Sequence, residues 1–182
     1  MLDADVLYPF LVRDILLSLA EAGLFQARWS QAIMDEWQRN LLAARPDRRP
    51  QVVETARIMA EAFPEAMVDD FDALIDSIDL PDPDDRHVVA AAITAGAQLV
   101  VTNNARHFPT TALAPHGIAG ISPDDLVVDL LKDGASDVVE ALCNMRLRYS
   151  RPSFSAAEMI AAIAKAGMTK TAMALRPHTA DL

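Results

Sequence analysis

Acidic side chains at three places in this 182-residue chain have the types and surroundings that could hold a metal ion. Asp3 and Asp5 follow a very short apolar start, Glu36 lies near the boundary of the apolar face of an expected helix, and Asp84 and Asp85 belong to a proline-containing loop. Carboxylates that converge repel one another, so a cluster of them is stable only when it is protonated or binds cations. Oxygen ligands suit Mg²⁺ or Mn²⁺, and one or two such ions can activate water for phosphodiester cleavage. We expect a site of this kind if the three places meet in the fold.

The stretch from residue 80 to residue 104 predicts the structural unit that would position the acidic loop. The loop is followed by an apolar run over 88–92, by Gly96 and by strand-like residues 99–101. Periodicity and turn residues therefore predict loop, helix, turn and buried strand, which is half of an α/β crossover. The polar ends of such a unit can lie together at one edge of a sheet. Asp84 or Asp85 could instead cap the helix, and the stretch taken alone favours capping.

The other candidate positions could also have purely structural roles instead of binding a metal ion or phosphate. Asp3 and Asp5 are two residues apart, so on extended backbone their side chains point the same way, as they would on a surface strand. Glu36 is expected on a helix that Ser30 caps. A glutamate at the boundary of the apolar face is more commonly a solvated side chain than a ligand. The proline-bracketed segment 45–50 carries three arginines that could contact phosphate or form a solvated turn.

Helices are expected over much of the rest of the chain. Apolar spacing, capping residues and breakers predict helices over residues 10–23, 30–44, 51–63, 69–78, 135–148, 155–166 and 169–175. Ser122 and Pro123 predict a further helix start, and Arg151-Pro152 predicts the end of the helix over 135–148. Residues 24–29 are expected as a short strand or an extended link. The helical C-terminal third is expected to be a packing or partner-binding appendage.

Composition narrows the class of protein. The net charge is −10, from 26 acidic and 16 basic residues, which argues against a broad phosphate-tracking surface because nucleic-acid affinity depends on Lys and Arg. A nucleic-acid substrate stays compatible with this charge, since bound cations can neutralise an acidic cluster. No apolar run approaches the ~18 residues of a membrane span, and the acidic start is unlike a signal peptide. Cys143 is alone, which excludes an internal disulfide. We therefore expect a cytoplasmic protein with no membrane association.

Four segments carry a resemblance to a known family. They are LDADVLYP at the start, WSQAIMDEW, the long run LPDPDDRHVVAAAITAGAQLVVTNNARHFP, and ISPDDL after it. With these the chain resembles the PIN-domain nucleases, most closely the VapC-like toxins of type II toxin–antitoxin systems. The resemblance implies a three-layer α/β/α PIN-like domain with a central parallel sheet over 1–126. The helical extension over 127–182 is similar to one found in a longer subgroup of these toxins.

The resemblance also implies an activity and a site. It implies a Mg²⁺- or Mn²⁺-dependent endoribonuclease that cleaves single-stranded RNA, a homodimer, and a cognate antitoxin protein whose C-terminal segment fills the active-site groove. The residues that match the family's catalytic positions are Asp3, Glu36, Asp85 and Asn104, the first three as metal ligands, with Asp5, Ser30, Asp84 and Thr102 in support. Many relatives carry a fourth acid at the position of Asn104 or three residues later, where this chain has His107.

Two other functions stay open at this point. The absence of a fourth acid would also suit a catalytically weakened PIN-like module that acts in protein or RNA binding. A different metal-dependent phosphoesterase on a similar α/β frame is the third hypothesis, and activity on small phosphate esters but not on RNA would indicate it.

Overall fold

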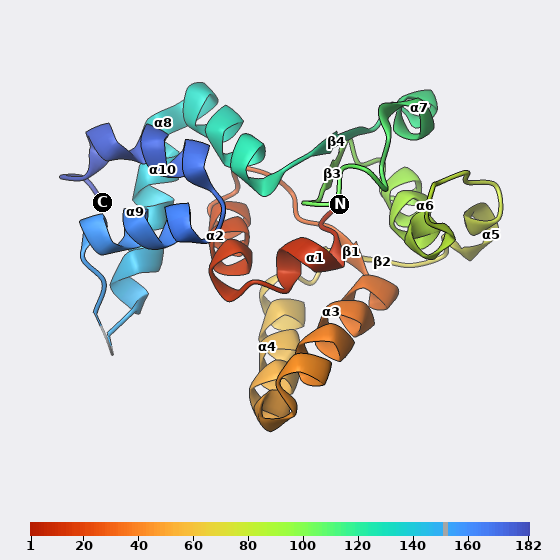
Figure 1. The fold of residues 1–182 in the computed structure, drawn as a ribbon, viewed down its shortest axis with the longest axis horizontal. Coiled ribbons are helices and arrows are strands. Elements are labelled where there is room, and N and C mark those ends of the chain that lie inside the picture. Colours follow the sequence, from red (N-terminus) through yellow and green to blue (C-terminus); the bar gives the residue numbers. More distant parts are fainter. Residues whose placement is uncertain (151–152) are drawn as a thin grey trace. The chain divides into compact units, whose positions relative to one another are not determined.

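The computed structural model describes residues 1–150 and 153–182, and the chain forms two compact units (Figure 1). The units consist of residues 1–8 with 27–121, and of residues 9–26 with 122–182. The predicted domains, 1–126 and 127–182, are contiguous in sequence, whereas these units are not. A helix near the N-terminus therefore belongs to the same compact unit as the C-terminal helices. Within the described ranges, no helix is both long and apolar enough to cross a membrane.

Short parallel strands form the centre of the first unit. They pair as β1 (Trp29–Ser30) with β2 (Met67–Val68), and as β3 (Leu99–Val101) with β4 (Ala119–Ile121). The N-terminal residues join the two pairs. The Leu2 N–H donates to the Arg28 carbonyl, 2.8 Å away, and the Asp3 N–H donates to the Val101 carbonyl, 3.1 Å away. The predicted α/β fold with parallel strands is confirmed, and Asp3 lies at the end of the central extended segment.

The other elements of the first unit are helical. They are α1 (Ala4–Leu7), α3 (Gln31–Ala44), α4 (Arg49–Ala62), α5 (Asp72–Ile75), α6 (Arg86–Thr94) and α7 (Thr110–Leu113), with 3-10 turns at Pro46–Arg48, Pro83–Asp85 and Ala114–His116. Ser30 caps α3 as predicted, because its hydroxyl accepts a hydrogen bond from the Ile33 N–H at 3.3 Å. Gly96 follows the end of α6 with a φ of 60°, which a residue without a Cβ adopts at little cost.

The prediction of one extended backbone through both N-terminal acids is wrong. The extended segment ends at Asp3, whose carboxylate accepts a hydrogen bond from the Ala4 N–H at 2.7 Å and caps α1. Asp5 therefore lies on a single helical turn. Residues 24–28 form the link that was one of the two alternatives, and strand β1 begins only at Trp29.

In the part that the structure describes, the second unit is built from helices, with one isolated antiparallel β-bridge between Ser150 and Ser153. It consists of α2 (Phe10–Glu21), α8 (Pro123–Arg148), α9 (Ala156–Lys165) and α10 (Thr169–Leu175), with a 3-10 turn at Arg176–His178. Helix α2 packs against α8, and α10 packs against both α8 and α9 (Figure 1). Helix α8 merges two predicted helices and is interrupted at Gly134, where the backbone is extended. It ends at Arg148, and the predicted stop at Arg151-Pro152 lies outside the described residues.

Candidate metal centre

One hydroxyl group links the two N-terminal acids to the end of β3. The Thr102 Oγ1 atom lies 2.7 Å from Asp3 Oδ2 and 3.3 Å from Asp5 Oδ2. Because a hydroxyl donates one proton, the nearer Asp3 oxygen is the better acceptor. Asp5 Oδ2 also accepts from the Asn103 N–H at 3.0 Å, and Thr102 Oγ1 accepts from the Asn104 N–H at 2.9 Å. The carboxyl end of strand β3 thus binds two acids that lie almost a hundred residues before it in the sequence.

These carboxyl groups are held in an environment that opposes their ionisation. Asp3 is only 5% exposed, and its burial, followed by the charge of Asp5, raises its pKa to about 7. Asp85 makes a smaller contribution in the same direction. Burial also raises the pKa of Asp5, and the charges of Asp85 and Glu36 add to this effect against the hydrogen bonds to Asp5 that lower it. The acids predicted from three separate places therefore act on one another electrostatically.

Asp85 occupies the N-cap position of α6, but its side chain binds a histidine. Asp82 makes the capping contact of the preceding 3-10 turn, since its Oδ1 accepts from the Asp84 N–H at 3.0 Å. Within the described residues, the Asp85 side chain makes no capping hydrogen bond, and its Oδ2 lies 2.7 Å from His107 Nδ1. The prediction that Asp84 or Asp85 caps this helix is therefore wrong. Burial raises the pKa of Asp85, the His107 contact lowers it, and the charges of Asp82 and Glu36 raise it again.

An acidic pocket of about 640 Å³ opens beside these groups. Its lining residues are Ala32, Asp35, Glu36, Arg39, Asp82, Asp84, Asp85, His87, Asn104 and His107. Three of the four predicted catalytic residues line it, and the fourth, Asp3, is buried close enough to be affected by the charge of Asp85. The Glu36 Oε2 atom lies 3.6 Å from His87 Nε2, and Asn104 Oδ1 accepts a hydrogen bond from Arg106 Nε at 3.1 Å.

The supporting residues occupy different positions. Thr102 orients Asp3 directly, whereas Ser30 is buried and acts through the start of α3, the helix that carries Glu36. The arginine-rich segment is a separate feature. Arg45 and Arg48 both form ion pairs with Asp47 on the surface, at 3.1 and 3.5 Å, which agrees with the solvated-turn interpretation.

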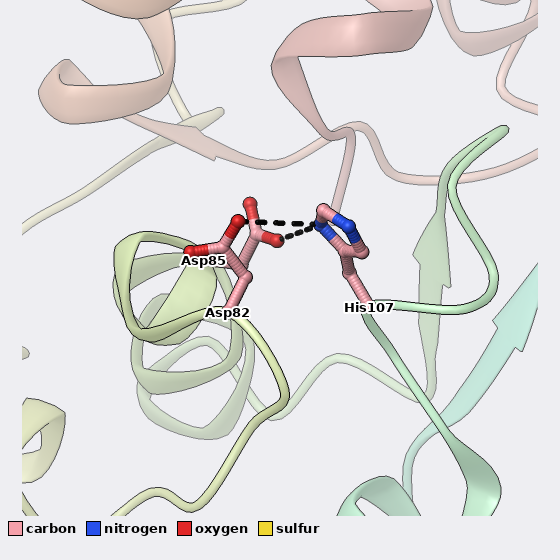
Figure 2. Close-up of side chains that lie close together, drawn as sticks. All are labelled: Asp82, Asp85 and His107. Carbon is pink, nitrogen blue, oxygen red and sulfur yellow. Dashed lines mark hydrogen bonds and ion pairs between the residues drawn. The ribbon is translucent and has the colours of Figure 1, made fainter.

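The structure also identifies a cluster that the sequence analysis did not propose. Figure 2 shows His107 reaching from the loop after β3 toward Asp82 and Asp85 at the start of α6. One potential ligand atom from each of these residues lies within 4.8 Å of the other two. The spacing Asp82-x-x-Asp85 around a helix start was visible in the sequence, and His107 lies at one of the positions where the family resemblance implied an acid. The long-range contact between them was not predictable from local patterns.

The described residues have the charges that a divalent cation requires. Carboxyl groups that raise one another's pKa become easier to ionise when a cation binds between or beside them. In addition, among the residues that the structure describes, Asp5 Oδ1 is a buried carboxylate oxygen without a hydrogen-bond partner. The predicted ligands Asp3, Glu36 and Asp85 do not approach one another as closely as the His107 cluster does, in the part of the chain described. Their joint role as metal ligands stays a prediction.

Comparison with known proteins identifies the family. The PIN domain family matches residues 1–106, which is more than half of the chain, and the chain therefore belongs to that family. The family described as VapC50 C-terminal domain matches residues 123–177. The chain is thus a VapC-like PIN-domain protein with a helical C-terminal extension, as the motifs predicted.

A curated relative agrees with this assignment. The chain is 35% identical over 79 residues to a protein of Mycobacterium tuberculosis (strain ATCC 25618 / H37Rv) named "Putative ribonuclease VapC50". The matched segment covers 43% of this chain and 47% of that relative, so the chain matches about half the length of the relative. No solved structure gives a significant match.

Proposed function

We propose that this protein is a divalent-metal-dependent endoribonuclease that cleaves single-stranded RNA. The observation that supports this function is the group of carboxyl groups, Asp3, Asp5 and Asp85, whose pKa values are all raised beside an acidic pocket. Family membership adds to it, because the matched relative is named as a ribonuclease. A protein with a net charge of −10 would need a cation to bring phosphate to such a pocket.

The proposed roles follow from where the side chains lie. Asp3 and Asp85 would hold the cation through carboxylate oxygens, and the Thr102 hydroxyl keeps the Asp3 carboxylate in place. Glu36 would complete the ligand set or accept a proton from the attacking water. Asn104 would orient that water, or ligate a second cation, through its amide oxygen. When bound, Mg²⁺ or Mn²⁺ supplies Lewis acidity and lowers the pKa of water for phosphodiester hydrolysis.

The biological setting that we propose is a toxin–antitoxin pair in the cytoplasm. The protein would be the toxin, would form a homodimer, and would be inhibited by a cognate antitoxin. The acidic lining of the pocket favours a basic antitoxin segment, since complementary charge increases the association rate and the specificity of an interface.

Cleavage of a labelled single-stranded RNA tests the function. We expect wild-type protein to cleave with Mg²⁺ or Mn²⁺ and to lose cleavage with EDTA, and we expect Asp3→Asn to cleave at least about 100-fold more slowly. A duplex of the same sequence is the substrate control and should be cleaved poorly. Equal rates in wild type and variant, or cleavage in EDTA, would remove the mechanism.

The alternative is a weakened PIN-like module that binds protein or RNA without cutting it. The hydrogen bond from Arg106 to the Asn104 side chain favours this alternative, because it engages one of the two lone pairs of the amide oxygen that would bind a cation. Calorimetric titration distinguishes the two functions. No Mn²⁺ binding at millimolar concentration would indicate the binding module.

A further inference from the structure

We infer that His107 ligates the divalent cation of this pocket together with Asp82 and Asp85, and that the site therefore selects Mn²⁺ and similar transition metals over Mg²⁺. This inference rests on the proposed function only in placing a cation in the same pocket. It assigns a nitrogen ligand, and with it a class of metal, to a site for which the sequence predicted oxygen ligands.

The geometry of the three side chains carries the inference. His107 Nδ1 lies 2.7 Å from Asp85 Oδ2 and 3.7 Å from Asp82 Oδ2 (Figure 2). Neighbouring ligand atoms around an octahedral cation with bonds of about 2.1 Å are themselves about 3 Å apart. The observed separations bracket that value, so small side-chain rotations would admit the cation in place of the histidine proton.

The backbone holds the three groups in this arrangement. The Asp82 carbonyl accepts from the Asp85 N–H at 3.3 Å, and Asp82 Oδ1 accepts from the Asp84 N–H, which leaves Asp82 Oδ2 on the side of the histidine. The His107 N–H donates to the Asn104 carbonyl at 2.9 Å, and the next residue, Phe108, is only 3% exposed and anchors the loop. A pre-formed set of ligands loses little conformational entropy when the cation binds.

The cluster is partly exposed and lies among other acidic groups. The Asp85, Asp82 and His107 side chains are 19%, 42% and 23% exposed, so the cluster is open to an ion from solution and partly shielded from water. Among the described residues, Asp5 Oδ1 is a buried carboxylate oxygen with no hydrogen-bond partner, although Asp5 is not a member of the three-residue cluster. The negative charge of Asp85 acts on Asp5, so the two carboxylates belong to the same acidic region.

The ligand set determines which cation is preferred. Imidazole nitrogen favours divalent transition metals, with Mn²⁺ at the weak end of that series, whereas Mg²⁺ prefers an all-oxygen shell that includes several waters. A site with two carboxylates and one imidazole should therefore bind Mn²⁺ more tightly than Mg²⁺. A second histidine, His87, is the competing source of nitrogen, because its Nε2 lies 3.6 Å from Glu36 Oε2 in the same pocket.

Pulsed electron paramagnetic resonance of bound Mn²⁺ tests the inference directly, because a nitrogen ligand gives a ¹⁴N modulation. We expect this modulation in the wild type and in His87→Asn, and its loss in His107→Asn. His116→Asn is the matched control, since His116 is exposed in the turn at 114–116, and it should keep the modulation. Calorimetry should show Mn²⁺ affinity falling about tenfold in His107→Asn while Mg²⁺ affinity changes less than about threefold.

A second variant guards against a folding defect. His107→Asp replaces the nitrogen with a carboxylate oxygen, so it should bind Mn²⁺ without ¹⁴N modulation and should shift the preference toward Mg²⁺. The inference is overturned if wild type shows no ¹⁴N modulation, or if the modulation persists in His107→Asn. RNA cleavage that requires Asp3, with no nitrogen ligand detected, would overturn this inference and leave the proposed function standing. Nitrogen-ligated Mn²⁺ without RNA cleavage would do the reverse.

Discussion

The tripeptide Pro-Asp-Asp occurs at the start of two helices of this protein, and the two copies have opposite electrostatic outcomes. At the start of α8, Asp124 accepts hydrogen bonds from the backbone N–H groups of Lys170 and Thr171 at 3.0 and 2.7 Å, and so caps α10. Asp125 binds the Lys170 ammonium at 2.5 Å and the Ser122 hydroxyl at 2.7 Å, and these contacts lower its pKa. Every carboxylate of this copy has a partner that favours its charge.

At the start of α6 the same tripeptide is surrounded by other acidic side chains. Asp85 faces Asp82 and His107, and Asp84 is exposed at the pocket. Burial raises the pKa of Asp85, and the charges of Asp82 and Glu36 oppose the stabilising contact with His107. Two acids before a helix therefore have a structural role where hydrogen-bond donors contact them, and they are candidates for chemistry where further acids surround them.

The largest difference between the two copies is expected when one acid in each is neutralised. We expect Asp85→Asn to reduce the rate of RNA cleavage at least about 100-fold, because it removes a charge from the proposed metal ligands. Asp125→Asn should leave the rate within about twofold of wild type. Both variants are compared under Mn²⁺ saturation. Similar losses in both would mean that the two copies do not differ in function.

The effects on the free energy of unfolding should have the opposite order, with the larger loss at the start of α8. Asp124→Ala leaves two backbone N–H groups without their acceptor, so we expect it to lower the free energy of unfolding by about 2–3 kcal/mol. Asp85→Ala, measured without metal, should cause no loss of stability, because it removes a carboxylate whose charge its neighbours oppose. Urea denaturation in EDTA measures both. A larger loss in Asp85→Ala than in Asp124→Ala would contradict the assignment of structural and chemical roles.

The acidic cluster should make the metal-free protein less stable as the pH rises. The pKa of Asp3 is about 7 in the folded protein and 3.8 in the reference state, so the native state binds more protons than the unfolded state between these values. The free energy of unfolding should therefore fall from about pH 4 to about pH 7, by about 2–4 kcal/mol for this group. The measurement is urea denaturation in EDTA at pH 5 and pH 8.

Asp3→Asn is the control for that pH dependence, because the amide does not titrate. It should flatten the decrease, and saturating Mn²⁺ should reduce it in wild type, since the cation stabilises the ionised form. Wild-type stability that increases from pH 5 to pH 8 in EDTA would show that the carboxyl groups are not held against ionisation.

The smallest effect is expected for the exposed ion pair of the second unit. The Lys170 side chain is 62% exposed and that of Asp125 is 44% exposed, so water and salt screen their attraction. We expect Lys170→Met to leave the urea midpoint of unfolding almost unchanged. Denaturation at low and high salt measures this midpoint, and a large decrease would indicate a buried role that this exposure does not suggest.

Local signals in the sequence predicted most of the helices and the strand β3 well, although the helix expected over 69–78 is only the single turn of α5, Asp72–Ile75. Ser30 and Ser122 cap the helices that they were expected to cap, Gly96 follows α6 with a positive φ, and α10 spans the predicted residues 169–175. These features depend on backbone geometry and on hydrogen bonds within a few residues, so a local sequence pattern is sufficient to predict them. The family motifs likewise identified the PIN domain, because they combine residue types with spacing.

Contacts between distant residues decided everything that distinguishes the candidate site. Thr102 meets Asp3 across 99 positions, His107 meets Asp85 across 22, and Asp124 caps a helix that begins 45 residues later, around 169–170. Identical local sequences, Pro-Asp-Asp at 83–85 and 123–125, therefore acquired opposite pKa shifts. The amino-acid sequence determined which residues carry charge and where helices begin. Only the tertiary structure decided which charges are buried together, because desolvation and Coulomb energy depend on neighbours in space and not on neighbours in the chain.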